Sequence, residues 1–212
     1  MRGEPKARIP NRWGEGGKLR EEILVAAERL LGEAGREEAL SLRAVAREVG
    51  IAPPSIYLHF KDRAELVATL MAKAYGEFIA ELRAVGARHP ADDPEGALRE
   101  MARWYGRFAL EHPARYRLMF GVEQSVLPRE RLVEHPAMKV IDVWARAFAA
   151  CGYELQSDLG SDRARMSADR RGALLWAGLH GITTLRVAMP VEPTLDDMAL
   201  VTNDLVSSIL AG

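Results

Sequence analysis

Helical periodicity is the feature that most constrains the fold of this 212-residue chain. Apolar residues recur three and four positions apart along most of the sequence, and no run alternates apolar and polar residues convincingly at strand period. The sequence therefore predicts an all-α protein. Gly32 and Gly35 are expected to close the first helix, because glycine is common at helix C-termini. The predicted helices span about 18–32, 42–48, 53–59, 62–86, 94–111, 113–120, 136–151, 168–188 and 194–210.

Composition and charge exclude several classes of protein. Hydrophobic residues make up 48% of the chain, which permits a packed core, and the net charge of -1 excludes a histone-like polycation. The single cysteine excludes an internal disulfide and a cysteine-based zinc cluster. No apolar run approaches the roughly 20 residues needed to span a bilayer, and no signal peptide opens the chain. The single cysteine also suits a reducing cytoplasm, and the excess of arginine over lysine is typical of a GC-rich bacterial genome, so we expect a bacterial, cytoplasmic protein without a membrane partner.

Positive charge is concentrated at the N-terminus. Residues 1–20 hold six basic and two acidic side chains, a net charge of +4. A basic arm before a compact helical segment is typical of nucleic-acid binders, although a solubilising tail explains the charge equally well. Arg8 and Arg12 are candidates for insertion into a minor groove, as flexible arms do.

The window from Leu42 to Lys61 has the spacing of a helix-turn-helix. Two short helices that cross steeply need a small residue where they touch, and Ala46 has that place; Gly50 suits the tight turn four residues later. The residues that hold such a pair together from inside are apolar here, namely Val45, Val49, Ile51 and Ile56. Two short core helices of an ordinary bundle are the alternative.

Residues 18–66 resemble the N-terminal DNA-binding domain of the tetracycline-repressor (TetR) family, chiefly in Ser41-Leu42-Arg43 and in Ile56-Tyr57-Leu58-His59-Phe60 followed by Lys61-Asp62-Arg63. The resemblance covers about a quarter of the chain. It implies an all-α homodimeric transcription factor with a C-terminal domain that binds a small effector and pairs the subunits. The implied divisions are a flexible basic arm (1–17), a helix-turn-helix domain (18–64) and an effector-binding and dimerisation domain (65–212). Trp176 to Gly181 is similar to the Trp…His-Gly motif of one C-terminal subclass.

The motif also predicts which residues contact DNA. If Ile56 points inward, Ser55, Tyr57 and the Pro53-Pro54 edge can face the major groove, where proline rings can pack on a thymine methyl. Tyr57, His59 and Lys61 resemble the family's phosphate contacts, and Arg63 opens the long helix, where a phosphate is favoured. Arg43 is either a solvated charge or a base or minor-groove contact. The candidate DNA-binding residues are Ser41, Arg43, Pro53, Pro54, Ser55, Tyr57, His59, Lys61 and Arg63.

The hydroxyl usual in the family is missing at Ala52, so the recognition helix is expected to begin without a side-chain cap. Few polar groups in this segment can read bases. We therefore expect DNA shape and phosphate placement to supply much of the specificity.

Aromatic residues and methionines after residue 100 fall at helical spacings, which indicates a core before it indicates a pocket. By resemblance, some of them surround an effector cavity. His180 is either a packing histidine or a ligand contact. The candidate pocket residues are Trp104, Phe108, Met119, Trp144, Phe148, Trp176, His180 and Thr184.

The last two predicted helices carry apolar stripes that suit a four-helix, twofold dimer interface. Gly178 and Gly181 are tolerable inside a helix where another helix approaches closely. The candidate interface residues are Leu175, Leu179, Ile182, Leu195, Met198, Thr202, Leu205 and Ile209.

The sequence contains no motif that indicates an enzyme. The five histidines have no metal-binding spacing, and no phosphate loop or nucleophile elbow occurs. The pairs Asp92-Asp93 and Asp196-Asp197 are explained by helix capping. We therefore expect no catalytic residue, metal or cofactor, but a repressor that binds palindromic operator DNA as a homodimer until a small effector releases it. A helical adaptor protein and a small α-helical enzyme are the rival hypotheses.

Overall fold

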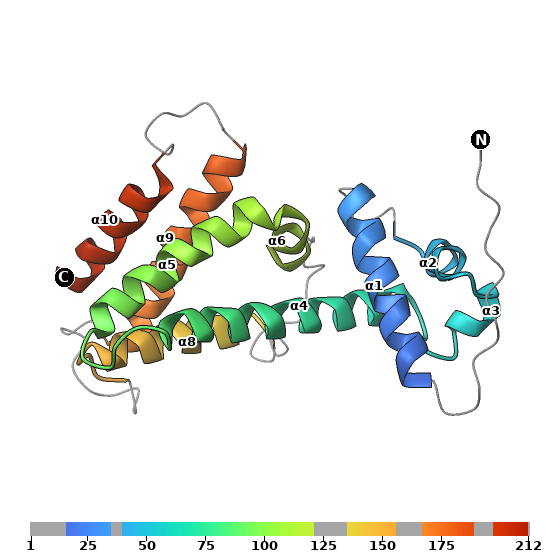
Figure 1. Cartoon of the computed structure of the whole chain (residues 1–212), viewed down its shortest axis with the longest axis horizontal. Helices are drawn as coiled ribbons and strands as arrows, with labels where there is room; N and C mark the ends of the chain where they lie inside the picture. The colour runs from blue at the N-terminus through green and yellow to red at the C-terminus, as the bar shows by residue number, and fades with distance from the viewer. Residues whose placement is uncertain (1–15, 35–39, 121–134, 156–166, 189–196, 212) are drawn as a thin grey trace. The chain divides into compact units, whose positions relative to one another are not determined.

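The computed structural model describes residues 16–34, 40–120, 135–155, 167–188 and 197–211. All regular structure in these ranges is helical, which confirms the predicted all-α class (Figure 1). No helix within them is long and apolar enough to cross a membrane. The helices are α1 (Gly16–Ala34), α2 (Leu42–Val49), α3 (Pro53–Ile56), α4 (Arg63–Gly86), α5 (Pro94–Glu111), α6 (Pro113–Phe120), α8 (Met138–Ala150), α9 (Ala168–Ala188) and α10 (Met198–Ala211).

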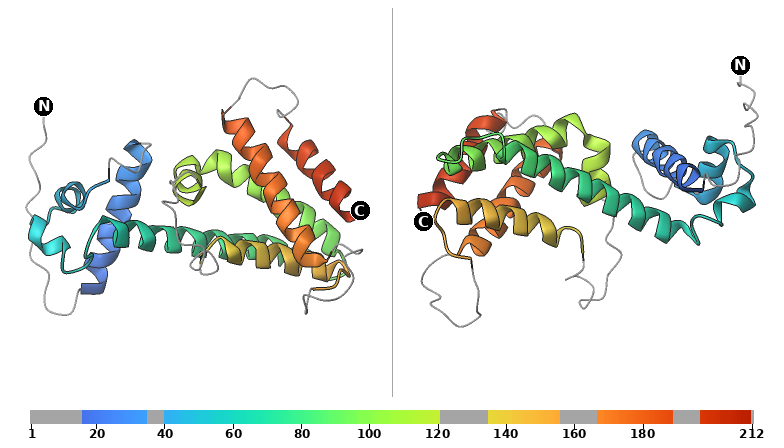
Figure 2. Two further views of the ribbon diagram at one scale, coloured as in Figure 1. Left: turned by 180° about the vertical axis from the view of Figure 1, so that it is seen from behind. Right: turned by 60° about the horizontal axis from the view of Figure 1, so that its bottom comes forward.

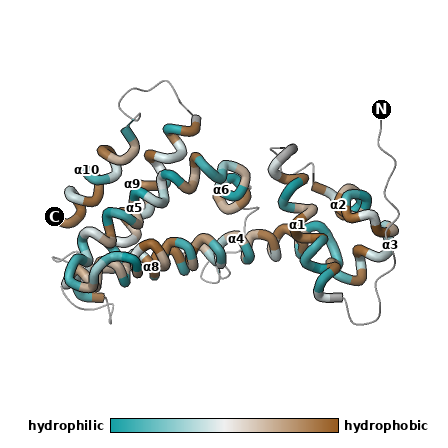
Figure 3. Tube along the Cα trace, in the orientation of Figure 1, coloured by the Kyte–Doolittle hydropathy of each residue, from teal (hydrophilic) through white to brown (hydrophobic). Residues whose placement is uncertain are grey.

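The chain divides into two compact units, and the division falls inside α4. Unit 1 comprises Met1–Ala74 and Ala114–Glu123, and unit 2 comprises Tyr75–Pro113 and Gln124–Gly212. Hydrophobic and hydrophilic positions alternate in short bands along the helices of both units (Figure 3). Each unit therefore has its own amphipathic helices and its own core.

Unit 1 is built around α1, which packs against α2, while α2 packs against α3. The core side chains Ile23, Val45, Ile56 and Phe60 are all fully buried. Gly32 was expected to end α1, but the helix continues to Ala34. The glycine instead permits close packing, since a Cβ atom on it would lie 3.4 Å from the Cβ of Ala114 in α6.

Unit 2 is held together by α9, which packs against α5, α8 and α10 (Figure 2). α8 and α9 approach each other closely at Gly172, where a Cβ atom would lie 2.7 Å from the backbone nitrogen of Ala145. Only glycine fits such an approach without a shift of α8. Gly178 likewise lies against Leu205 of α10, whereas none of the described residues lies within 4 Å of the Cβ position of Gly181.

Side-chain caps fix the ends of helices in unit 2. Asp93 accepts a hydrogen bond from the backbone N–H of Gly96 at 2.9 Å, which confirms it as the cap of α5. At the far end of α10, the hydroxyl of Tyr153 donates to the carbonyl of Leu210 at 2.7 Å, and Arg171 donates to the carbonyl of Ile209. The Arg171 guanidinium stacks 4.1 Å from the Tyr153 ring centroid, so both donors hold the C-terminus of α10.

Candidate nucleic-acid interface

The first helix of the candidate motif begins as predicted. Ser41 is the N-cap of α2, and its hydroxyl accepts a hydrogen bond from the N–H of Ala44 at 3.1 Å. Just before it, the carbonyl of Leu40 accepts a hydrogen bond from Nε of Arg63 at 2.9 Å. The start of α2 is therefore held by its own cap and by the first residue of α4.

The turn after α2 depends on Gly50. This glycine has φ 77°, in the left-handed region, and its N–H donates to the carbonyls of Ala46 and Arg47. The N–H of Ile51 then donates to the carbonyl of Ala46 at 2.9 Å. These bonds satisfy the last carbonyls of α2 and turn the chain toward α3, which confirms the role predicted for Gly50.

The second helix is shorter than the predicted 53–59. α3 ends at Ile56, and the chain continues in tighter i to i+3 turns, with the N–H of His59 donating to the carbonyl of Ile56 at 3.0 Å. Ala52 provides no side-chain cap, as expected, and two prolines occupy the first turn. The first N–H after them, that of Ser55, already donates to the carbonyl of Ala52 at 2.8 Å. The missing hydroxyl therefore leaves few donors unsatisfied.

The candidate DNA contacts divide into two groups by exposure. Ser55, His59 and Arg63 are half-buried. The other six are exposed, and Ile56 between them is fully buried, which confirms its inward direction. The exposed candidates are Ser41, Arg43, Pro53, Pro54, Tyr57 and Lys61.

The beginning of α4 differs from the predicted phosphate site. The side chain of Asp62 accepts a hydrogen bond from the N–H of Glu65 at 2.8 Å, and Glu65 in turn accepts one from the N–H of Lys61 at 2.7 Å. Carboxylates thus already occupy donors that a phosphate would use, and the Nε of Arg63 bonds to Leu40. Of the two cations predicted here, the exposed Lys61 is better placed than Arg63 for a DNA phosphate.

Leu58 was not among the sequence-derived candidates. It lies next to Tyr57 and is exposed. Both residues belong to α3 and the turns that follow it, residues 53–60, which we call the recognition segment. In the sequence it reads as one of several apolar residues in Ile56–Phe60, two of which are core residues. Only the turn geometry after α3 separates Leu58 from those buried neighbours.

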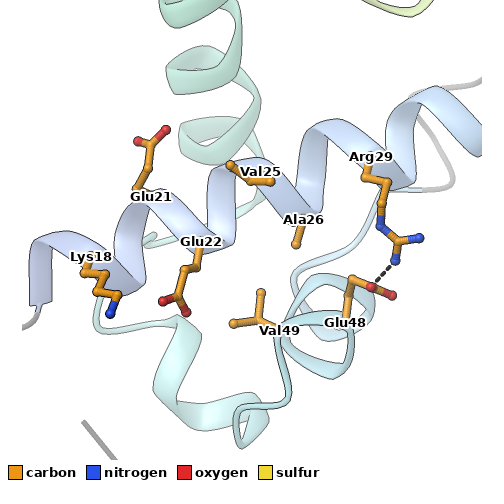
Figure 4. Close-up of a pocket in the computed structure, with 8 residues that line it drawn as sticks. All are labelled: Lys18, Glu21, Glu22, Val25, Ala26, Arg29, Glu48 and Val49. Carbon is orange, nitrogen blue, oxygen red and sulfur yellow. Dashed lines mark ion pairs between the residues drawn. The ribbon is translucent and has the colours of Figure 1, made fainter. Parts of the chain in front are cut away.

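Unit 1 also contains a hollow between α1 and α2 that the sequence did not indicate (Figure 4). Val25, Ala26 and Val49 form its apolar part, and an ion pair between Arg29 and Glu48 lies at one side. The remaining lining residues are Lys18, Glu21 and Glu22. None of the candidate DNA or effector residues lines this hollow.

The effector candidates fall in both units. Met119 belongs to α6 in unit 1, and the other seven belong to unit 2. Trp104 and Phe108 lie together, with ring centroids 5.2 Å apart, and both pack against Phe78, which the sequence did not single out. Trp144 and Phe148 are fully buried, whereas Thr184 is exposed.

His180 lies in contact with the aromatic cluster. Its Nδ1 is 3.4 Å from the hydroxyl of Tyr105, whose ring packs edge-on against Phe78. Burial lowers the pKa of His180 below its usual value, so the imidazole is neutral near neutral pH. The geometry favours the packing role for this histidine.

The dimer candidates also differ in exposure. Leu175, Leu179 and Thr202 are buried within the chain's own fold. Ile182, Met198, Leu205 and Ile209 are half-buried, and Leu195 lies outside the described residues, as do Arg8 and Arg12 of the arm. The apolar side chains of α9 and α10 that are exposed instead are Leu174, Leu185, Val187 and Leu200.

The described geometry defines a helix-turn-helix DNA-binding module followed by a helical domain, and the comparisons with known proteins agree. The model of "Bacterial regulatory proteins, tetR family" matches residues 23–70, and that of "Tetracyclin repressor-like, C-terminal domain" matches residues 98–207. The chain belongs to the tetracycline-repressor family. It is a non-enzymatic transcription regulator. The similarity of Trp176–Gly181 to the Trp…His-Gly subclass is not confirmed by these matches.

Solved structures show the same fold. The regulatory protein SCO4313 is 28% identical with a TM-score of 0.70, and the match covers 96% of this chain and 100% of that one. SmeT, the repressor of the Stenotrophomonas maltophilia multidrug efflux pump SmeDEF, solved with triclosan, is 21% identical with a TM-score of 0.68 over 90% and 91% of the chains.

FadR from Bacillus subtilis, solved with stearoyl-CoA, is 14% identical with a TM-score of 0.68, and the match covers 91% of this chain and 98% of that one. The comparison with curated proteins gave no match.

Proposed function

We propose that this regulator is a repressor that binds palindromic operator DNA as a homodimer and is released by a small-molecule effector. The observation that carries the proposal is the exposed surface of the recognition segment. Pro53, Pro54 and Tyr57 are exposed there, while Ile56 behind them is buried and the caps at Ser41 and Gly50 hold α2 in place. A rigid short helix with an exposed face suits insertion into a major groove.

In the proposed complex, α3 enters the major groove, and Lys61 and Arg43 contact phosphates on its two sides. Tyr57 and Ser41 add neutral hydrogen bonds to the backbone of the DNA, and His59 lies within the same turn. Two such modules, related by a twofold axis, would place their recognition helices about 34–36 Å apart over successive major grooves. Arg63 acts in this proposal by holding Leu40.

The effector proposal rests on the aromatic interior of unit 2. Trp104, Phe108 and Trp144 supply apolar surface there, and the Nε1–H of Trp144 is buried with no hydrogen-bond partner among the described residues. An apolar molecule with one hydrogen-bond acceptor fits this lining. Structures of the same fold contain triclosan in SmeT and stearoyl-CoA in FadR. An effector that favours a different spacing of the two recognition helices would shift the population away from the DNA-binding state.

The subunits are proposed to pair through α9 and α10. Leucine and valine side chains that are half exposed on these helices, such as Leu185 and Leu200, would lose water on pairing. A self-complementary patch of this kind gives a closed twofold dimer.

DNA binding is tested by titrating the protein with the intergenic DNA beside its own gene, at several salt concentrations. We expect tight binding that weakens steeply with salt, because phosphate contacts release counterions. Binding no tighter than to an unrelated duplex would contradict the repressor function and would favour the adaptor hypothesis.

A further inference from the structure

The recognition segment contains an apolar side chain with no core to pack in. Leu58 is 85% exposed, more than any other large hydrophobic side chain in the described ranges, among which Leu200 follows at 57%. A single exposed leucine on a surface is ordinary by itself. Its position directly after α3, in the segment that enters DNA, is what requires an explanation.

The surface around Leu58 offers little hydrogen bonding. Ala52, Pro53 and Pro54 are exposed and have no polar side-chain atom, while Ser55 and His59 are half-buried. Tyr57, 52% exposed, supplies a hydroxyl beside Leu58. This edge can therefore recognise bases chiefly by contact with apolar groups.

The backbone places Leu58 one turn after Ser55. The N–H of Leu58 donates to the carbonyl of Ser55 at 3.3 Å, within the tighter i to i+3 turns that follow α3. Residues three apart lie on one side of such a turn, about 6 Å along its axis. Because base pairs rise about 3.4 Å, side chains at this spacing reach neighbouring base pairs. The apolar group that a major groove presents to them is the C5-methyl of thymine.

Charge around this edge favours DNA over an apolar protein surface as its partner. Arg43, Arg47 and Lys61 are exposed on the same two short helices and the turn that follows them. The nearby carboxylates already have partners, since Glu48 pairs with Arg29, and Asp62 accepts the N–H of Glu65. In such a complex Leu58 would contact the edge of a base, and the cationic side chains around it would contact the phosphates on either side.

We propose that Leu58 determines sequence specificity by packing on the C5-methyl group of one thymine in each half of the operator. The inference rests on the proposed DNA-binding function. It adds a base contact beside the Pro53-Pro54 edge, in a segment whose Tyr57 and Lys61 are proposed to contact the backbone of the DNA.

The test removes the methyl group alone. The full-length protein is first used to select its site from a pool of random duplexes. The thymines of that site are then replaced by uracil, one at a time. Dissociation constants are measured for the wild type, Leu58→Ala, Leu58→Met and Val25→Ala. Val25 is the matched control, because it is 55% exposed and lies on α1 of the same unit.

At one thymine per half-site, uracil should weaken binding of the wild type about four-fold, as expected when one methyl group leaves an apolar contact. Leu58→Ala, which loses the contact in both half-sites, should bind the thymine site about sixteen-fold more weakly and show no further loss with uracil. Leu58→Met and Val25→Ala should keep the sensitivity to uracil.

Two results would overturn the inference while leaving DNA binding intact: a wild type that is indifferent to uracil at every position, or a Leu58→Ala variant with the full uracil effect. If no sequence is enriched from the pool, the proposed DNA-binding function fails, and the inference fails with it. Circular dichroism of each variant checks that the fold is retained.

Discussion

At the scale of single residues, two neighbouring cations have different tasks. Lys61 is exposed, whereas Arg63 is half-buried and donates from Nε to the carbonyl of the buried Leu40. Both resemble phosphate contacts in the sequence. The structure assigns Arg63 an intramolecular contact, so the two substitutions should have separable effects.

We expect Lys61→Ala to weaken operator binding and to flatten the slope of log affinity against log salt by about 1.8, because each of the two subunits loses one phosphate contact worth about 0.9. Arg63→Ala should instead lower the free energy of unfolding by about 1–3 kcal/mol, because it removes the donor to a buried carbonyl. Salt titrations and denaturant melts of both variants measure these effects. An equal change of salt dependence in Arg63→Ala would show that Arg63 contacts DNA directly.

The buried imidazole of His135 makes stability depend on pH. Its Nδ1 accepts the N–H of Ala137 at 3.1 Å, so the neutral ring carries its proton on Nε2, and the ring packs edge-on against Tyr75. Burial lowers the pKa of His135 below the usual 6.5. The unfolded chain therefore binds a proton more readily than the folded one.

The contribution of His135 to the free energy of unfolding should accordingly not change with pH well above 6.5. It should become destabilising as the pH falls below 6.5 toward the lower pKa of the folded state. His180, whose pKa burial also lowers, contributes in the same direction. Denaturant melts across this range test the expectation, and His135→Gln should show a shallower dependence. A variant with the wild-type dependence would exclude His135 as a source.

At the scale of helices, boundaries were predictable where side-chain chemistry marks them. α5 begins at Pro94 and ends at Glu111, as the Asp93-Pro94 signal indicated, and Gly50 ends α2. Local signals of this kind do not report packing. Gly32 has the appearance of a helix end, yet it lies within α1, and Ala114 from a distant part of the sequence lies beside it.

The exposure of the candidate residues was predictable to the same extent. Ser41, Tyr57 and Lys61 follow from the motif and are exposed, but the exposure of Leu58 was not predicted because its direction depends on the tight turns after Ile56. The candidate interface residues Leu175 and Leu179 have interface-like spacing, yet they are buried by neighbouring helices of the same chain. Periodicity identifies an apolar face without identifying what covers it.

Two glycines of α9 provide a matched test of helix packing. A Cβ atom at Gly172 would lie 2.7 Å from the backbone nitrogen of Ala145, whereas no atom of the described part of the chain lies within 4 Å of that position at Gly181. We expect Gly172→Ala to destabilise unit 2 by about 1–3 kcal/mol through overpacking. Gly181→Ala should stabilise the chain by about 1 kcal/mol, as in an open helix interior. Thermal melts distinguish the two, and a stabilised Gly172→Ala would mean that α8 and α9 do not meet this closely.

At the scale of the whole molecule, the proposed dimer depends on which face of α9 and α10 is free. Leu205 is half-buried and lies where a Cβ atom on Gly178 would contact it. A charge at Leu205 would therefore disturb packing within the chain as well as between chains. Leu185, 50% exposed on α9, separates the two effects better.

Leu185→Glu should split the dimer while helical content is kept, because two like charges would meet near the twofold axis. Operator affinity should then fall steeply, since each subunit would hold only half a site without the benefit of bivalency. Leu110→Glu, an equally exposed leucine of α5, is the control and should remain dimeric. Sedimentation of both variants measures their oligomeric state. A Leu185→Glu variant that is folded and still dimeric would place the interface on another face.

The proline pair that opens α3 has a thermodynamic consequence. Pro53 and Pro54 fix two backbone angles in the chain before any DNA is present, and Gly50 needs no strain to make the turn ahead of them. The recognition segment is therefore ordered in advance, and association need not spend free energy on folding it. Calorimetry of operator binding should give a heat-capacity change that matches the surface removed from water, without the additional negative contribution that accompanies coupled folding.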